Sequence, residues 1–490
     1  MQEGTIELTA LTAVEAVTAI AAGDITAAAL AEALIEQAQR WQAVNALVNF
    51  NGDDFLAAAQ AADEKRAAGG PLAPLHGLPM VVKDNIDVAG FATTAATPAL
   101  AGHFPGHDAP VVRALRDAGA IVMAKANMHE LAFSPGITPP EGGGKIIYGA
   151  HGAARNPYDL KRSPAGSSTG TAAAIAAQVA PAGLGSDTGG SVRNPAAWCG
   201  LAGFRPSIGR YEQTGVVPIS WTRDTIGPMA RSIGDLVLLD GIITGESQPP
   251  VAELDKVRLG LDRDFFCTDA DADILDIFEG EIDRLTAAGA EIVDVKIPGL
   301  EELIGAAGQG IAMYEIIRAL PRYLVESGSG VTLDAVFSNI AASGLSARLD
   351  GLCGTEAISE ADYRTSMDEV RPALQSVYAD CFQANRLDAL IFPATLILPY
   401  MLQEPGTHMH KGEEISDFAA SGHNVQPASI GGSPGLTITA GITPAGLPAA
   451  IGFDGPFGHD AKLLAIGKAY EAIRPPIPAP PVPILHQTVS

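Results

Sequence analysis

Two segments of the sequence concentrate small polar residues in a way that a packed core does not require. The first, residues 163–170, contains the adjacent Ser167 and Ser168. The second, residues 185–195, places two glycines directly before Ser191. Adjacent glycines let the backbone approach a ligand and turn successive N–H groups toward one point, as an oxyanion hole requires. The ordinary alternatives are helix capping by Ser and Thr for the first segment and a plain glycine-rich turn for the second.

A lysine stands at the end of an apolar run upstream of both segments. Lys83 follows residues 80–82, Met-Val-Val, and precedes Asp84. Burial disfavours the ammonium form, so an amine at this position can lose its proton near neutral pH and act as a base. The ordinary alternative is a charged lysine whose amine reaches water or pairs with Asp84 or Asp87. For the lysine taken alone, that alternative is favoured.

The combination of these features resembles the amidase signature family of Ser–cis-Ser–Lys hydrolases. Ser167 and Ser191 lie 24 positions apart, a strand-end lysine precedes them, and residues 185–200 read GSDTGGSVRNPAAWCG. Further similarity covers the helical start of the chain and residues 77–79, 124–130 and 446–448. The resemblance therefore accounts for most of the chain.

The resemblance implies a role for each of the three residues. Ser191 is the nucleophile, Ser167 is the bridging serine whose peptide bond is cis, and Lys83 is the base. Neutral Lys83 would draw a proton through Ser167 from Ser191, whose oxygen attacks the carbonyl and forms an acyl-enzyme. The expected oxyanion donors are the backbone N–H groups of Thr188, Gly189, Gly190 and Ser191.

Three neighbouring residues are expected to support this machinery without reacting. By the same resemblance, Asp187 and Arg193 brace the glycine-rich loop, and a simple ion pair between them is enough for that. Ser168 stands beside the bridging serine and either supports it by hydrogen bonding or only caps the helix that follows.

The histidines do not suggest a metal site. His129 is expected to be a packed or hydrogen-bonded residue. His408 and His410 resemble a metal dyad only superficially, because they alternate along an expected loop and no companion carboxylate motif accompanies them. We therefore assign no metal and expect no cofactor.

Some residues near the site depart from the family pattern. The family usually shows a double glycine before the paired serines and another glycine after them, whereas residues 164–170 read PAGSSTG. Ala165 is expected to narrow the freedom of the backbone there. The loop 133–153 carries extra length at residues 139–144 and could shape the mouth of the pocket. No cluster of Arg or Lys near the motifs suggests an acidic substrate, so an uncharged amide, aryl amide or carbamate is preferred.

The first elements that must hold these residues are helices. Residues 8–70 read as a helical layer, in which Thr12 and Glu15 form a capping box and Thr26 caps the run 27–41. The run 169–180 is apolar around its whole circumference and predicts a helix buried on all sides. A site at the start of that helix would lie inside the protein.

Short apolar runs broken by Gly, Pro and Asp predict strands from residue 75 onward. The fold class expected is α/β: a large mixed, twisted β-sheet covered by helices on both faces, as in the amidase signature fold. A single large domain is preferred, with 1–70 as its N-terminal helical layer and 71–490 as its α/β part. The predicted strands are 80–82, 120–123, 257–261, 291–295, 389–392 and 436–439, and the further helices are 108–118, 271–288 and most of 300–382.

The bulk composition limits the partners. A formal net charge of −25 over 490 residues argues against nucleic acid and anionic membranes, whose binding relies on Lys and Arg. The four cysteines are scattered without CxxC pairing, so neither a disulfide framework nor a zinc site is suggested. The start of the chain lacks a signal peptide and no apolar run reaches bilayer length. We expect a cytoplasmic monomer or homodimer acting on a small molecule.

Three other functions stay open at this point. One is an amidotransferase-type subunit that releases ammonia from glutamine or asparagine, which the acidic composition disfavours. Another is a GxSxG esterase with Ser168 as nucleophile, because residues 166–170 fit that pattern. It needs a strand directly before the serine, which the prolines and turn residues there disfavour. The last is a non-catalytic scaffold, which would have no reason to keep all three candidate residues.

Overall fold

The computed structural model describes residues 7–133, 145–247 and 249–482, so the extra length predicted at 139–144 lies outside the described residues. The strands of the main sheet are β1 (Leu47–Val48), β2 (Pro79–Lys83), β3 (Ile121–Ala126), β4 (Ala182–Asp187), β5 (Ala202–Arg205), β6 (Thr225–Ala230), β7 (Arg258–Leu261), β8 (Glu291–Asp294), β9 (Ala389–Pro393), β12 (Gly435–Ile442) and β13 (Pro448–Asp454). Within the described residues these strands form one 11-stranded sheet in the order β1-β3-β2-β4-β6-β5-β12-β13-β9-β7-β8. Parallel and antiparallel pairs both occur, so the sheet is mixed.

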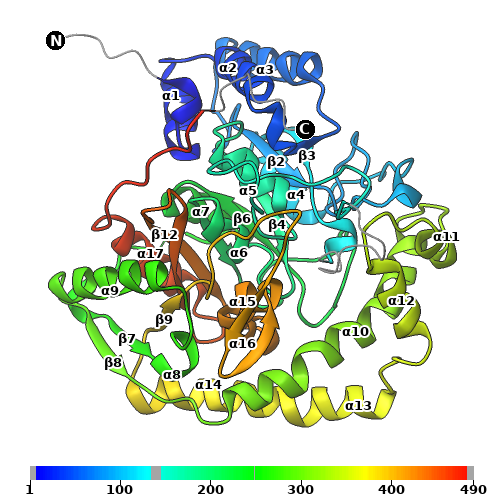
Figure 1. The fold of residues 1–490 in the computed structure, drawn as a ribbon. Coiled ribbons are helices and arrows are strands. Elements are labelled where there is room, and N and C mark those ends of the chain that lie inside the picture. The colour runs from blue at the N-terminus through cyan, green and yellow to red at the C-terminus, as the bar shows by residue number, and fades with distance from the viewer. Residues whose placement is uncertain (1–6, 134–144, 248, 483–490) are drawn as a thin grey trace.

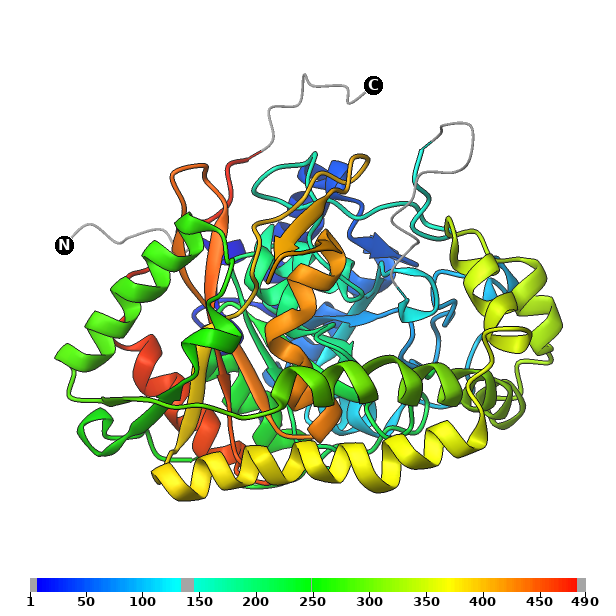
Figure 2. The same ribbon diagram turned by 60° about the horizontal axis from the view of Figure 1, so that its bottom comes forward.

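Helices lie around this sheet, which confirms the predicted fold class (Figure 1). The α-helices are α1 (Ala13–Ala22), α2 (Ala27–Arg40), α3 (Gly52–Ala67), α4 (Pro110–Asp117), α5 (Thr169–Ala176), α6 (Arg193–Trp198), α7 (Ile233–Thr244), α8 (Arg263–Phe266), α9 (Ala272–Ala287), α10 (Leu300–Glu326), α11 (Leu333–Ser338), α12 (Leu345–Cys353), α13 (Glu360–Thr365), α14 (Arg371–Asn385), α15 (Asp417–Gly422), α16 (Gln426–Gly431) and α17 (Asp460–Glu471). The long helices α10 and α14 run side by side along one side of the molecule (Figure 2).

The N-terminal helices begin where the sequence predicts. Thr12 and Glu15 form the expected capping box at the start of α1, and the Thr26 side chain accepts from Ala29 N at the start of α2. Buried side chains of α1, α2 and α3 belong to the same hydrophobic core as those of β2, β4 and β12. Within this layer α3 packs on β3, α2 packs on α3, and α1 packs on α7.

Three neighbouring parallel strands bring the candidate residues to one edge of the sheet. Strand β2 lies between β3 and β4 and runs parallel to both, so the carboxyl ends of all three strands meet. Lys83 ends β2, and Asp187 ends β4. Helix α5 packs on these strands, and every one of its residues is buried, as predicted. A Cβ on Gly183 of β4 would lie 2.7 Å from Val81, so the close approach of β4 to β2 requires a glycine there.

One prediction about local structure is wrong. The segment containing His408 and His410 was expected to be a loop, but it forms strand β10 (Thr407–His410), which pairs antiparallel with β11 (Glu413–Ser416). Lys411 and Gly412 connect the two strands, and both have positive φ, as a two-residue hairpin turn requires. The strands are short and largely exposed, so they lack the apolar alternation by which a strand is recognised in a sequence.

Candidate active site

Lys83 is fully buried at the end of β2. Its Nζ donates to Ser167 Oγ and to Ser186 Oγ, both at 2.8 Å. Burial lowers the pKa of this amine to about 7, against the opposing charges of Asp187 and Asp224. A substantial fraction of the amine is therefore uncharged at neutral pH.

The two carboxylates next to Lys83 in the sequence pair with other residues. Asp84 pairs with Lys125 Nζ at 3.4 Å, and Asp87 accepts a hydrogen bond from the Tyr323 hydroxyl at 2.8 Å. Within the described residues, Lys83 forms no ion pair. The ordinary interpretation, a lysine that reaches water or pairs with Asp84 or Asp87, is wrong. Burial keeps the amine from water, and both carboxylates contact other residues instead.

Ser167 lies in the tight loop before α5. The Gly166–Ser167 peptide bond is cis, as the resemblance implies, and the Ser167 side chain is buried. The Ser167 carbonyl accepts from His129 N at 3.2 Å. A Cβ on Gly166 would lie 2.2 Å from the His129 ring, so this position requires glycine. Ala165, which the sequence marks as a departure from the family pattern, adopts φ of +60°.

His129 is a packed residue, as predicted. Its ring lies against Tyr148, with 5.3 Å between the ring centroids. Burial, and then the nearby charge of Lys83, lower the His129 pKa to about 3. The imidazole is therefore neutral and adds no charge beside the lysine.

Ser168 fixes the serine loop to strand β4. Its Oγ donates to Ser186 O and accepts from Ser186 N, both at 3.3 Å, and its backbone N donates to Ser191 O at 3.3 Å. The side chain is fully buried, and no strand precedes it in the described residues 145–167. The GxSxG alternative with Ser168 as nucleophile therefore fails, because that motif needs a serine exposed on a strand-to-helix turn.

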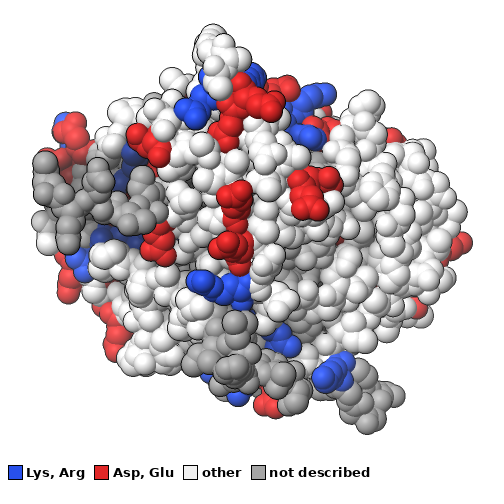
Figure 3. Space-filling view, turned by 90° about the horizontal axis from the view of Figure 1, so that it is seen from above, with Lys and Arg blue, Asp and Glu red and all other residues white. Residues whose placement is uncertain are grey.

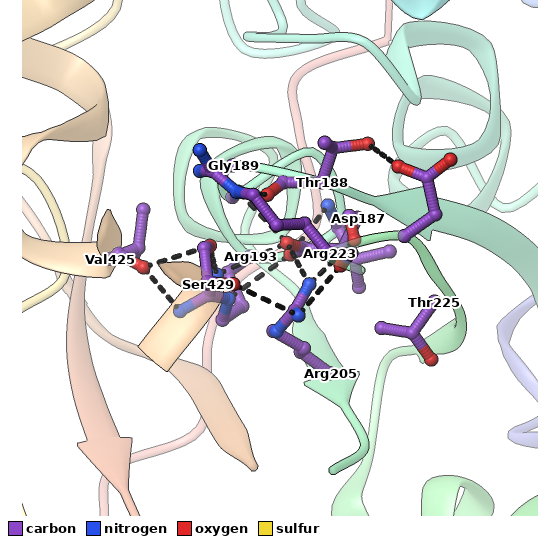
Figure 4. A network of polar contacts seen from close by, with 12 residues as sticks. Asp187, Thr188, Gly189, Arg193, Arg205, Arg223, Thr225, Val425 and Ser429 are labelled. Carbon is purple, nitrogen blue, oxygen red and sulfur yellow. Dashed lines mark hydrogen bonds and ion pairs between the residues drawn. The ribbon is translucent and has the colours of Figure 1, made fainter. Parts of the chain in front are cut away.

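The Asp187 carboxylate shapes the glycine-rich loop, as Figure 4 shows. It accepts from Gly190 N at 2.8 Å and from Val192 N at 3.2 Å. Arg193 and Arg205 both pair with it, at 3.1 and 3.0 Å, and they hold its pKa well below the usual range in spite of complete burial. The predicted ion pair between Asp187 and Arg193 is present.

Two carbonyl groups of the glycine-rich loop accept hydrogen bonds from side chains outside the loop. Arg223 Nε donates to Thr188 O at 3.2 Å, and Gln426 Nε2 donates to Gly189 O at 3.1 Å. Since the N–H of a peptide points away from its carbonyl, these contacts fix the direction of the N–H groups that follow. The Gly190 N–H is already used by Asp187, so it is not available to an oxyanion in this arrangement. Of the four predicted donors, Thr188, Gly189 and Ser191 remain.

Ser191 lies at the surface of this assembly, half-buried. Its hydroxyl makes no hydrogen bond to the residues that the structure describes, so its link to Ser167 stays a prediction. The two serine segments are joined through their backbones by the bond from Ser168 N to Ser191 O. The candidate groups thus run from a fully buried amine at Lys83 to a half-exposed hydroxyl at Ser191.

Several site residues were missed in the sequence. Ser186 and Asn85 complete the surroundings of the lysine, because Asn85 Nδ2 donates to Ser186 Oγ at 3.1 Å. Ser186 lies in the marked segment 185–195 and Asn85 stands two residues after Lys83, but no spacing pairs either of them with the lysine. Arg205 ends the apolar run 201–204 as a lone cation, which is the same signal that singled out the lysine, whereas Arg223 follows the mixed residues 220–222, Ser-Trp-Thr, and has no such signal.

The face of the molecule seen in Figure 3 carries its charge in small groups. On the face in Figure 3, acidic and basic side chains are scattered and much of the surface is uncharged. None of the helices within the described residues combines the length and apolarity that crossing a bilayer demands.

Comparisons with known proteins agree with this geometry. The chain is 38% identical over 454 residues to indoleacetamide hydrolase of Agrobacterium vitis, covering 91% of this chain and 94% of that one. It is 38% identical over 473 residues to mandelamide hydrolase of Pseudomonas putida, covering 94% and 91%. The crystal structure of peptide amidase from Stenotrophomonas maltophilia superposes with a TM-score of 0.82 at 27% identity, over 97% of this chain and 99% of that one. The amidase family model matches residues 29–464, so the chain belongs to the amidase family and hydrolyses amide carbon–nitrogen bonds.

Proposed function

We propose that this amidase hydrolyses the primary amide of a small, uncharged aromatic compound through an acyl-enzyme on Ser191. The observation that carries the proposal is the buried Lys83 amine, which has no carboxylate partner in the described chain and contacts the Ser167 hydroxyl at 2.8 Å. An uncharged amine in that position is a base, and Ser167 is the hydroxyl through which it would act.

The reaction then proceeds in two halves. Ser167 takes the proton of Ser191 while its own proton passes to Lys83, and the Ser191 oxygen attacks the amide carbon. The N–H groups of Thr188, Gly189 and Ser191 stabilise the oxyanion. The carbon–nitrogen bond breaks as the relay returns the proton to the nitrogen, which leaves as ammonia. Water, deprotonated by the same relay, attacks the acyl-enzyme and releases the carboxylic acid and free Ser191.

Two lines of evidence support an uncharged aromatic substrate. The two relatives are named for hydrolysis of indoleacetamide and mandelamide, which are primary amides that carry an aromatic ring. The arginines beside the loop, Arg193, Arg205 and Arg223, are buried, and each donates hydrogen bonds to protein groups. They are therefore not offered to a substrate carboxylate, in keeping with the expectation of a neutral amide.

The test is a substrate series assayed by ammonia release. Phenylacetamide, indole-3-acetamide, mandelamide, an anilide, a carbamate and glutamine would be compared on the purified chain, with Ser191→Ala as the control. We expect the arylacetamides to give the highest kcat/KM and the variant to be inactive. Preference for glutamine or asparagine would instead support the amidotransferase-type alternative. Undiminished activity in Ser191→Ala would overturn the assignment of the nucleophile.

We further infer that the enzyme acts without nucleic acid, as a cytoplasmic monomer or homodimer. The net charge of −25 supports the first point, because phosphate backbones bind clusters of Lys and Arg. Size-exclusion chromatography with light scattering tests the oligomeric state.

A further inference from the structure

Three potential metal ligands converge outside the set of residues described above. Glu301 lies in the first turn of α10, His410 ends β10, and His423 begins the 3-10 helix η7 (His423–Val425). One ligand atom from each residue lies within 4.8 Å of the other two. The sequence considered His410 only with His408, whose ring instead contacts the Asp269 carbonyl at 2.6 Å. The histidine that the fold brings to His410 is His423, 4.5 Å away between ring centroids.

His410 is a buried imidazole without a hydrogen-bond partner. The residue is 6% exposed, and neither Nδ1 nor Nε2 has a partner in the described part of the chain. Buried polar atoms are nearly always satisfied, so an imidazole with both nitrogens unpaired calls for an explanation. A bound cation beside His423 and Glu301 supplies one.

The surroundings of His423 fix which of its nitrogens can accept a cation. Asn424 Nδ2 donates to Phe266 O at 2.9 Å and to Pro393 O at 2.7 Å, so Asn424 Oδ1 is the acceptor that faces His423 Nδ1 at 2.8 Å. His423 Nδ1 therefore carries the proton, and Nε2 of the neutral ring presents a lone pair. That lone pair faces Glu301 Oε1 at 3.4 Å. Two acceptors that face each other need a cation between them.

We propose that Glu301, His410 and His423 bind a divalent transition metal of the zinc class. Two imidazole nitrogens and one carboxylate oxygen form a donor set that zinc prefers, with the His423–Asn424 contact as the outer hydrogen bond that orients a ligating histidine. On binding, the three atoms draw together to about 3.4 Å, the edge of a tetrahedron with bonds of about 2.1 Å. Lys411 Nζ contacts the other carboxylate oxygen, Oε2, and leaves Oε1 to the metal.

The position of this cluster gives the metal a supporting role. Two residues after His423, the Val425 carbonyl accepts from Arg193 Nη1 at 3.0 Å. The next residue, Gln426, donates through Nε2 to the Gly189 carbonyl. A metal on His423 would therefore link the β10–β11 hairpin and the start of α10 to the segment 423–426, which supports the glycine-rich loop. The metal restricts the motion of this segment and takes no part in the chemistry.

Titration of the chelator-treated full-length chain with ZnCl₂, followed by calorimetry and thermal unfolding, tests the proposal. We expect one zinc per chain and a higher unfolding temperature with zinc. His410→Ala and Glu301→Gln should each weaken binding by about 100-fold or more. His408→Ala, on the same strand but outside the cluster, should bind as the wild type does, and circular dichroism would establish that each variant is folded. Wild-type binding no tighter than that of folded His410→Ala and Glu301→Gln would overturn the proposal and leave a proton between His423 and Glu301 as the cation.

Discussion

Lys83 and Lys125 lie on neighbouring parallel strands, and both amines are fully buried. Lys125 pairs with Asp84 at 3.4 Å and donates to Thr93 Oγ1 and Ala92 O at 3.0 and 3.2 Å. Among the described residues, Lys83 donates only to uncharged oxygens, those of Ser167 and Ser186. Burial lowers both pKa values, but a paired carboxylate opposes it directly only at Lys125. Two equally buried lysines thus differ in role: Lys125, beside a carboxylate, is a structural cation, and Lys83, beside hydroxyl groups, is a candidate base.

Removal of the Lys83 amine should give the largest effect on catalysis. We expect Lys83→Met to lower kcat/KM by about 10²–10⁴-fold, the usual contribution of a positioned general base. Its free energy of unfolding should stay near the wild-type value, because Ser186 keeps its contact with Asn85 and no charged partner is left behind. Steady-state kinetics and urea denaturation check both parts. An active Lys83→Met, or one that fails to fold, would remove the contrast with Lys125.

Removal of the Lys125 amine should instead affect stability. Lys125→Met leaves the Asp84 carboxylate buried without its cation and should lower the free energy of unfolding by about 3–5 kcal/mol. The double variant Lys125→Met/Asp84→Asn should recover part of the loss, since the unpaired charge is gone. Urea denaturation of the single and double variants measures this. Full stability in Lys125→Met would show that the pair is not structural.

The smallest effect should come from the second hydroxyl at Lys83. Ser186→Ala removes one of the two 2.8 Å contacts of Nζ, and a hydrogen bond of about 0.5–1.5 kcal/mol corresponds to a loss of roughly 2- to 13-fold in kcat/KM. Ser167→Ala, which removes the bridging hydroxyl, should lose far more activity. Equal losses in the two variants would mean that both serines only hold the lysine in place.

The sequence predicts well what local chemistry decides. The caps at Thr12 and Thr26 and the strand that ends at Lys83 follow from residue types and spacing. The buried helix also starts at Thr169 as predicted, although it ends at Ala176, earlier than expected. The fold class and the family follow from the resemblance around Ser167 and Ser191, which the family match bears out.

What could not be predicted depends on contacts between distant segments. Strand β4 reads AGLGSD, and its glycines are explained only by close approach of other segments: of Val81 and Thr171 at Gly183, and of Ser168 and Val192 at Gly185. That Asp84 pairs with Lys125, and that Arg205 and Arg223 hold the glycine-rich loop, depends on which strands become neighbours. The use of the Gly190 N–H by Asp187 likewise needs the folded loop.

The central claim is that an uncharged Lys83 activates Ser191 through Ser167. The most direct measurement is the rate at which a fluorophosphonate labels Ser191, followed by intact-mass and peptide mass spectrometry from pH 5 to 10. Because the amine must be deprotonated and its pKa is about 7, the rate should rise tenfold per pH unit below about pH 7 and level off above it. In Lys83→Met, labelling should be slow and lose this midpoint. Labelling of another residue, a wild-type rate that still rises steeply between pH 9 and 10 as an ordinary lysine pKa of 10.5 would give, or an unchanged pH profile in Lys83→Met would contradict the account.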